Sequence, residues 1–167
     1  QLAQKDLKKK DIDIKILYGV EINVAPRQLD IIRNASAVSL KDSTYVFFDL
    51  ETSGLSNEFD DIIEFGAVKV VNGRVEENID ILINPGHPVS TFTTELTGIT
   101  NEMLQDKRTI QEELPRIMDF FKDYILVAHN GSFDVGFIEH ALKRKLTNPI
   151  IDTLPLARFL YPEEKRY

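Results

Sequence analysis

Tyr45-Val46-Phe47-Phe48-Asp49-Leu50-Glu51 is the stretch from which the fold can be predicted. It is apolar up to its acids, as is typical of a central strand that is covered on both faces, and Thr52-Ser53-Gly54 ends it. Because side chains alternate along a strand, Asp49 and Glu51 leave the same face, on which Phe47 precedes them. The sequence therefore predicts two neighbouring carboxylates at the end of a core strand.

Strands and helices alternate after this stretch. Ile62 to Val71 and Arg74 to Ile83 are predicted strands, joined by Asn72-Gly73, which favours a type I′ hairpin. Thr109 and Glu112 form a capping-box pair that begins a helix, which Pro115 is expected to kink or restart. The later elements are a strand over 125–128, a helix capped by Ser132, a strand over 149–152 and a helix over 154–160. This order predicts an α/β fold, a mixed sheet with flanking helices.

Asp134 lies near the start of one predicted helix, where it lines up with Ile138 and Leu142, which should face the core. Burial of an unpaired carboxylate is costly. The alternatives are a carboxylate that only meets the helix dipole and, for Asp49 and Glu51, the solvated end of a strand. Three acids at one end of a sheet instead favour hard divalent cations, since like charges this close repel unless a cation lies between them.

Composition narrows the function classes. The chain of 167 residues has no cysteine, which excludes disulfides and thiolate metal sites. Its net charge of −7 argues against binding of nucleic acid through a basic surface and favours contact through bound cations. No two of its three histidines have the helical spacing of a zinc site. The chain has neither a membrane-spanning run nor a signal peptide, so we expect a cytoplasmic protein with no membrane partner.

Residues 1–43 differ in pattern from residues 44–167. A Lys-rich stretch from Leu2 to Lys10 is a predicted helix, and the alternation over 12–18 is typical of a strand. One helix and one strand do not make a core. We therefore expect residues 1–43 to be a fragment of another domain with a linker, and residues 44–167 to form the α/β domain.

Five blocks of the sequence resemble the DEDD (DnaQ-like) 3′→5′ exonucleases, which have a ribonuclease H-like fold. They occur in the family's order as Phe48–Leu55, Ile63–Val68, Glu95–Thr100, Val127–Phe137 and Ile151–Leu154. The resemblance covers about residues 44 to 167 and is nearest to the exonuclease domain of PolC-type alpha subunits of bacterial DNA polymerase III. Lys15–Asn23 looks like a strand of the PHP (polymerase and histidinol phosphatase) domain that surrounds that exonuclease, with Glu21 at a metal-ligand position.

The resemblance implies a proofreading 3′→5′ DNA exonuclease that hydrolyses the terminal phosphodiester with two Mg²⁺ or Mn²⁺ ions. Asp49, Glu51 and Asp134 would be catalytic and metal ligands. Asp49 would bridge both ions, Glu51 would hold the ion that activates water, and Asp134 would support the second. The 3′-terminal nucleotide would be contacted by Thr52, Leu96, Thr97, Asn130 and Phe133. The implied partners are a single-stranded or frayed DNA 3′ end, the rest of the polymerase alpha chain and the replisome.

One departure concerns the family's third motif, a histidine followed six positions later by an aspartate. It should follow residue 167, and His140 does not replace it, because Leu146 stands six positions later. We therefore expect a chain that is truncated at both ends, incomplete at its C-terminus, and weak or inactive alone. The alternatives are another DnaQ-like exonuclease, helicase-associated or RNA-trimming, and a catalytically incomplete nucleic-acid-binding module.

Overall fold

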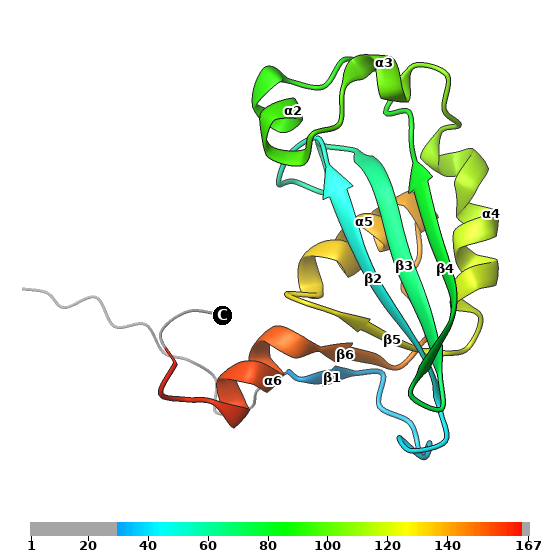
Figure 1. The fold of residues 1–167 in the computed structure, drawn as a ribbon, viewed down its shortest axis with the longest axis vertical. Helices are drawn as coiled ribbons and strands as arrows, with labels where there is room; N and C mark the ends of the chain where they lie inside the picture. The colour runs from blue at the N-terminus through cyan, green and yellow to red at the C-terminus, as the bar shows by residue number, and fades with distance from the viewer. Residues whose placement is uncertain (1–29, 165–167) are drawn as a thin grey trace, which may run out of the picture.

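A six-stranded mixed sheet forms the centre of the computed structural model, which describes residues 30–164 (Figure 1). The strands are β1 (Ile32–Arg33), β2 (Thr44–Thr52), β3 (Ile62–Val71), β4 (Arg74–Leu82), β5 (Ile125–Ala128) and β6 (Ile150–Asp152). The helices are α2 (Thr91–Thr97), α3 (Asn101–Leu104), α4 (Ile110–Phe121), α5 (Ser132–Leu142) and α6 (Thr153–Leu160). Their order across the sheet is β1-β6-β5-β2-β3-β4, with β2 parallel to β5 and antiparallel to β3. The predicted α/β fold is confirmed.

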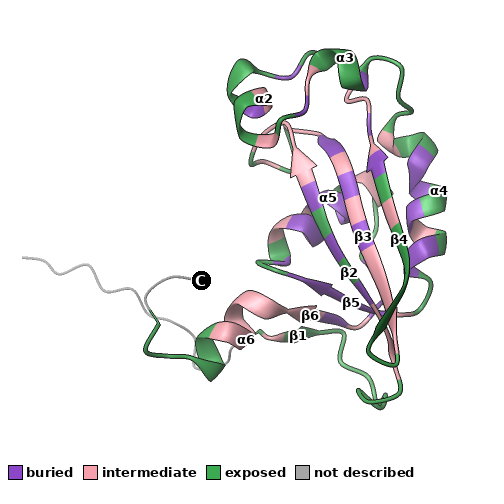
Figure 2. Ribbon diagram, in the orientation of Figure 1, coloured by how far each residue is buried: buried purple, intermediate pink, exposed green. Residues whose placement is uncertain are grey.

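One face of β2 faces the protein core, and the other is open. Val46, Phe48 and Leu50 are buried, whereas Phe47 is 44% exposed and Asp49 is exposed (Figure 2). The buried cluster that contains the first three side chains also contains side chains of α4 and α5, so both helices pack on the same face. The prediction that β2 is covered on both faces is therefore wrong within the described residues, because no described helix packs over its second face.

Three aromatic rings join the sheet to α4. Phe121 meets Phe48 and Phe65 edge-on, with ring centroids 5.0 Å and 5.6 Å apart. All three side chains are buried. Edge-to-face pairs of this kind add to the stabilisation that burial alone provides. This packing fixes the sheet strand that carries Asp49 and Glu51 against the helical layer.

The predicted hairpin between β3 and β4 is confirmed. Asn72 and Gly73 both have positive φ angles, 50° and 74°, as a type I′ turn requires. The turn pairs Val71 with Arg74 and, after a bulge near Lys69, brings Gly66 opposite Asp80. The hairpin therefore sets which side chains of β4 lie beside those of β3.

The start of α4 is the predicted capping box. The backbone N–H and the hydroxyl of Thr109 both donate to the Glu112 carboxylate, at 2.8 Å and 2.9 Å. The helix continues through Pro115 without a break, which corrects the expected restart. Pro115 stands in the second turn of the helix.

Replacement of Thr109 by alanine should lower the free energy of unfolding by about 1 kcal/mol, the usual effect of losing an N-cap residue. Urea denaturation followed by circular dichroism measures this change. A threonine-to-alanine substitution at exposed Thr147, which has no such capping role, is the control. An equal loss in both variants would contradict the assigned cap.

Three elements differ from the sequence prediction. Helix α5 begins at Ser132 itself with Gly131 as its N-cap, so Ser132 does not cap it. The short helices α2 and α3 were not predicted. Ser90 caps α2 by accepting a hydrogen bond from the Thr93 N–H at 3.0 Å. This cap lies in a Thr-rich segment whose composition favours strands over helices.

Segment 30–34 is attached to the sheet. β1 pairs antiparallel with β6, and the side chain of Arg33 pairs with that of Glu139 on α5. The amide of Asn34 donates to the carbonyls of Leu146 and Asn148, at 2.8 Å and 2.9 Å. The predicted helix over 2–10, the predicted strand over 12–18 and Glu21 lie outside the described residues, and the division at residue 43 stays a prediction.

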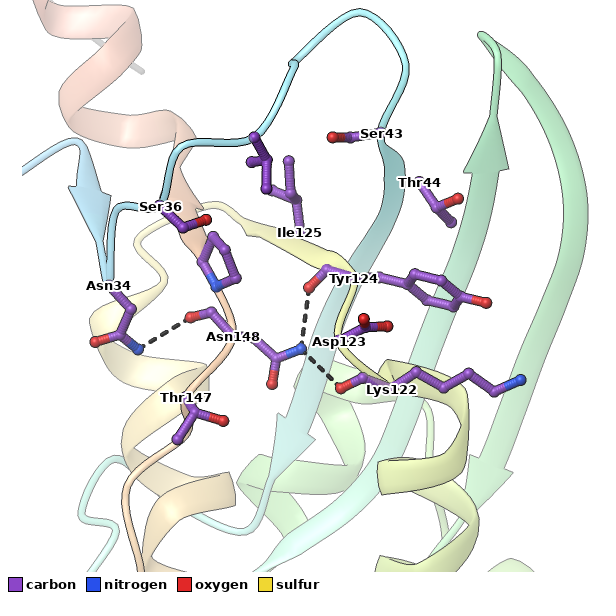
Figure 3. A pocket seen from close by; sticks show the side chains of 12 residues that line it. Asn34, Ser36, Ser43, Thr44, Lys122, Asp123, Tyr124, Ile125, Thr147 and Asn148 are labelled. Atoms are coloured by element: carbon purple, nitrogen blue, oxygen red, sulfur yellow. Dashed lines mark hydrogen bonds between the residues drawn. The ribbon is translucent and has the colours of Figure 1, made fainter.

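A cavity of about 440 Å³ lies where β2 and β5 begin, and residues Asn34, Thr44, Tyr124 and Asn148 are among those that line it (Figure 3). The amide of the buried Asn148 crosses it and donates to the carbonyls of Lys122 and Tyr124, both at 3.0 Å. Asn148 thereby satisfies two backbone carbonyls at the end of α4, so its burial in this cavity has a structural reason. In the part of the chain that the structure describes, no helix is both long and apolar enough to cross a membrane.

Candidate metal and catalytic site

The three acids predicted from the sequence lie near the C-terminal end of β2. Asp134, in the first turn of α5, accepts a hydrogen bond through Oδ1 from the backbone N–H of Leu50 at 3.1 Å. Leu50 stands between Asp49 and Glu51, so the Asp134 carboxylate lies against the backbone from which the other two side chains project. The predicted convergence of the acids on one end of the sheet is thus present.

Asp134 is the most buried of these acids, with 2% of its surface exposed. Burial, followed by the nearby negative charge of Asp49, raises the pKa of its carboxyl to about 7. The Leu50 N–H acts in the opposite direction but is outweighed. Its helix face also carries the buried Ile138, as the helical spacing predicts. The carboxylate is therefore held in the core at a cost in free energy.

The carboxyl of Glu51 also has a raised pKa. Partial burial and the charge of Asp49 raise the pKa of its carboxyl. The ion pairs among the described residues include no partner for Asp49, Glu51 or Asp134. The site therefore gathers negative charge that no lysine, arginine or histidine in residues 30–164 neutralises.

This set of ligands suits a hard cation. Carboxylate oxygens are the groups that Mg²⁺ and Mn²⁺ prefer. A cation would offset both the burial and the repulsion from Asp49 that raise the pKa of Asp134 and Glu51. Residues 30–164 contain no three ligating side chains already close enough to enclose an ion. The side chains are of the types that bind a divalent ion, but the carboxylates on β2 and α5 do not enclose an ion position.

Two further acids adjoin the site and were given no role from the sequence. Glu64 on β3 is the cross-strand partner of Glu51, and its side chain lies near that of Asp80 on β4. Burial and then the charge of Asp80 raise the pKa of the Glu64 carboxyl, with smaller contributions from Glu51 and Asp49. The position of Glu64 inside the apolar run of β3 is the feature of the sequence that could have indicated its role. Its proximity to Asp80 depends on the bulged register of the hairpin.

The open face of the sheet holds a broad cavity of about 700 Å³ beside the acids. Asp49, Asp80 and His129 are among the side chains that line it. His129 hydrogen-bonds through Nδ1 with the Thr153 hydroxyl at 3.0 Å. The lining of the cavity therefore combines acidic side chains with the apolar Phe47.

The turn between β5 and α5 is held in place by Asp152. Its Oδ1 accepts from the backbone N–H groups of Asn130 and Leu154, both at 3.0 Å. Asn130 has a φ of 57°, a left-handed conformation that asparagine tolerates. Its side chain is exposed beside the start of α5. This turn determines where the helix that carries Asp134 begins.

The other residues predicted to meet a terminal nucleotide differ in their surroundings. Leu96 on α2 is 72% exposed, and Phe133 is half-buried against Phe137 with ring centroids 5.0 Å apart. The Thr97 hydroxyl donates to the Thr93 carbonyl at 2.9 Å, and the Thr52 hydroxyl donates to the Gly54 carbonyl at 2.6 Å. The two threonines thus have structural roles, and the roles of all four toward a nucleotide stay predictions.

Comparison with known proteins agrees with this geometry. The family described as exonuclease, of the RNase T type, matches residues 46–167. The chain is 44% identical over 162 residues to a DNA polymerase III PolC-type of Streptococcus pneumoniae and 48% identical over 158 residues to one of Streptococcus pyogenes. These matches cover 95% and 92% of the chain but 11% of each relative. The chain thus spans about a ninth of the length of these relatives.

Solved structures give the same fold. Exonuclease X in complex with 5′ overhanging duplex DNA is 29% identical, with a TM-score of 0.62 over 74% of this chain and 68% of that one. Exonuclease I of E. coli in complex with an oligonucleotide is 21% identical, with a TM-score of 0.64 over 71% of this chain and 30% of that one. The second likeness concerns the fold alone. Both agree with a ribonuclease H-like sheet with flanking helices.

Proposed function

This chain belongs to the exonuclease family of the RNase T type, and from that premise we propose that it is the proofreading 3′→5′ DNA exonuclease part of a longer DNA polymerase III of the PolC type. The observation that carries the proposal is the hydrogen bond from Leu50 to Asp134, since it joins the acid of α5 to the strand of Asp49 and Glu51. The identity to PolC-type relatives supports the polymerase assignment.

In the proposed reaction the three acids hold divalent cations, Mg²⁺ or Mn²⁺, at the end of β2. A pair of such ions, when bound, stabilises the attacking and the leaving oxygen of the phosphodiester that is hydrolysed. Asp49 would be a ligand of both ions, Glu51 would hold the ion that activates water, and Asp134 would support the second. The burial of Asp134 favours this role, because a cation compensates a carboxylate that water does not reach.

The substrate is a single-stranded or frayed DNA 3′ end. Leu96, Phe133 and the Asn130 side chain contact its terminal nucleotide, with Thr52 and Thr97 beside them. Exonuclease X was solved with duplex DNA that has a 5′ overhang, which supports a DNA substrate with an accessible 3′ end. The rest of the polymerase chain and the replisome are the proposed partners. Residues 44–167 carry the exonuclease motifs, segment 30–34 adds β1 to their sheet, and residues 1–43 contain a fragment of the PHP-like domain.

Mn²⁺ binding tests the site directly. The wild-type chain should bind Mn²⁺, and Asp49→Asn should lower the affinity at least about 10-fold, a loss of about 1.4 kcal/mol, because one carboxylate ligand is removed. Isothermal titration calorimetry gives the affinities. Asp119→Asn on the exposed side of α4 changes the net charge equally and should leave the affinity unchanged.

The reaction is tested in the longer protein that carries this chain. A DNA strand labelled at its 5′ end should shorten stepwise from the 3′ end with Mn²⁺, and Asp49→Asn should abolish the shortening. A catalytically incomplete nucleic-acid-binding module would retain DNA binding and release no nucleotides. Mn²⁺ binding that Asp49→Asn leaves intact would refute the assigned ligands.

A further inference from the structure

Helices α2 and α3 pack on the end of the sheet through a small apolar cluster of their own. Its buried members, which are separate from the main core, are Ile63, Val89, Ile99 and Leu104. A unit that buries few apolar side chains has a low local stability, so polar contacts influence its position more than they do in the core. That position matters, because α2 carries Leu96, the proposed contact of the terminal nucleotide.

Two side-chain hydrogen bonds join this helical unit and the residues before it to the loop that follows β2. The Thr93 hydroxyl of α2 donates to the Ser53 carbonyl at 3.1 Å. Nε2 of His87 lies 2.8 Å from Oδ2 of Asp61, with which it forms an ion pair. Asp61 is in turn bonded to Ser53, because each backbone N–H donates to the other residue, at 2.8 Å and 2.9 Å. His87 is thereby connected to a residue two positions after Glu51.

Both ring nitrogens of His87 face acceptors. Nε2 faces the Asp61 carboxylate, and Nδ1 lies 3.2 Å from the Pro88 carbonyl oxygen. A neutral imidazole has one N–H, so both bonds form together only when the ring is protonated. The bond to Asp61, followed by the bond to Pro88, raises the pKa of the imidazole above its ordinary value. The pair is therefore complete at low pH and weakens as the pH rises through that raised pKa, since the neutral ring keeps one bond and no charge.

His87 is the one basic side chain of the two segments that meet here. Segments 51–68 and 83–106 contain no lysine and no arginine, and His87 is their single histidine. Asp60 in the loop and Glu102 on α3, which lines the same cavity as His87, are the other charged groups near the ring. Both are acids, so they favour the protonated ring. No other side chain of these segments can therefore replace the cation of this ion pair.

We propose that His87 is a positioning residue, whose protonated imidazole holds the residues before α2 against Asp61 of the loop and so keeps Leu96 in the place where it contacts the terminal nucleotide. This inference rests on the proposed exonuclease function and adds a dependence of DNA binding on the protonation of one side chain. The ring does not touch the reacting atoms. It acts through Asp61, which is bonded to the loop that begins beside the metal ligands.

The affinity for the trinucleotide (dT)3 at pH 6 and pH 9 tests the positioning role. Ca²⁺, which takes the same oxygen ligands, replaces Mn²⁺, and calorimetry measures the affinity. The side chains of His87 and Asp61 are 49% and 43% exposed, so their ion pair has a modest effect. His87→Ala should bind (dT)3 about two- to fivefold more weakly than the wild type at pH 6, the range that an exposed ion pair allows. The difference should shrink at pH 9. Comparison with the wild type at each pH cancels the titration of the metal ligands, which both proteins share.

Asp61→Ala separates positioning from a direct attraction between the imidazolium and a phosphate. Positioning predicts weaker binding of (dT)3 at pH 6, because the ring loses its partner. Direct attraction predicts tighter binding, because an acid is removed from beside the phosphates. Glu58→Ala removes an exposed acid from the same loop and measures the effect of charge alone. His140→Gln removes an exposed histidine of α5 and should leave the pH dependence unchanged.

Reciprocity supplies a measurement that a purely structural role would leave unchanged. If the protonated ring tightens the binding of (dT)3, then (dT)3 tightens the binding of the proton by the same factor. With Ca²⁺ present, the His87 imidazole should therefore bind its proton about two- to fivefold more tightly with (dT)3 than without it. NMR titration of the imidazole signals measures this change, and His87→Gln identifies the signal among the three histidines.

The outcomes distinguish this role from the function on which it rests. Equal proton affinity of His87 with and without (dT)3 overturns the positioning role, and this result comes from the wild type, so it does not depend on the folding of a variant. Tighter binding by Asp61→Ala than by Glu58→Ala also overturns it, in favour of direct attraction. Failure of the wild type to bind (dT)3 with Ca²⁺ at either pH would instead refute the proposed exonuclease site, and the inference with it.

Discussion

Asp134→Asn is expected to stabilise the metal-free protein at pH 8 by about 2–4 kcal/mol, although it removes a proposed catalytic residue. The Asp134 carboxyl is 2% exposed, and burial raises its pKa to about 7. At pH 8 the folded protein must hold this group as an uncompensated buried anion. Asparagine keeps the oxygen that accepts from the Leu50 N–H and has no charge, so the substitution removes the cost of burying that charge.

The sign of the pH dependence follows from proton binding. In the unfolded chain the carboxyl titrates near pH 3.9, and in the folded chain near pH 7. Between these values the folded state binds more protons, so the stability of the wild type falls as the pH rises. One pKa unit corresponds to 1.36 kcal/mol, which places the full loss at about 4 kcal/mol. The variant lacks this dependence and should match the wild type near pH 4.

Mn²⁺ should reduce this difference. A ligand that binds only the folded state at 100 times its Kd stabilises it by about 2.7 kcal/mol. The wild type should gain this stabilisation, and Asp134→Asn should gain much less of it. Urea denaturation at pH 4 and pH 8, with EDTA or with Mn²⁺, measures all four conditions, and Asp119→Asn controls for the change in net charge. A variant that is less stable than the wild type at pH 8 in EDTA would show that the buried charge is already compensated.

The sequence predicted this site because the face from which each acid projects is set by its near neighbours in the chain. Alternation along β2 places Asp49 and Glu51 on one face, and helical spacing aligns Asp134 with Ile138. Both inferences need only a few neighbouring residues. The hydrogen bond between Leu50 and Asp134 joins elements that are 84 positions apart. The apolar stripe behind Asp134 had predicted that this acid faces the sheet, and the family resemblance agreed with that prediction.

The parts that were not predicted depend on distant contacts. The open face of β2 reflects where α4 and α5 pack, which no alternation within β2 reveals. Helix α2 depends on its Ser90 cap and on the bond from Thr93 to Ser53, 40 positions away. The position of Glu64 beside Asp80 depends on a bulge in the hairpin. In each case the local pattern was weak or neutral, and tertiary contacts decided the structure.

The predicted domain boundary at residue 43 rests on a change in the sequence pattern. The contacts of segment 30–34 with the sheet lead to a prediction about the stability of shorter chains. A chain of residues 44–167 should be less stable than a chain of residues 30–167 by about 3–5 kcal/mol. It loses the β1 pairing to β6 and leaves the buried Glu139 without Arg33, which is one of its two basic partners. Removal of one partner from a fully buried ion pair costs about 3–5 kcal/mol. Glu139 keeps Lys145, so the ion pair contributes less than this, and the lost pairing of β1 and the lost hydrogen bonds of Asn34 add to it. Urea denaturation of both chains measures the difference.

The same segment should affect the metal site. The backbone N–H of Asp152 donates to the Ile31 carbonyl at 2.9 Å, and the Asp152 side chain holds the turn that precedes α5. Without Ile31 this aspartate loses a restraint, so the chain of residues 44–167 should also bind Mn²⁺ more weakly. Arg33→Met in the longer chain removes the ion pair but keeps the strand, and should lower stability with little effect on Mn²⁺ affinity. Equal stability and equal affinity in the two chains would place the domain boundary at residue 44 after all.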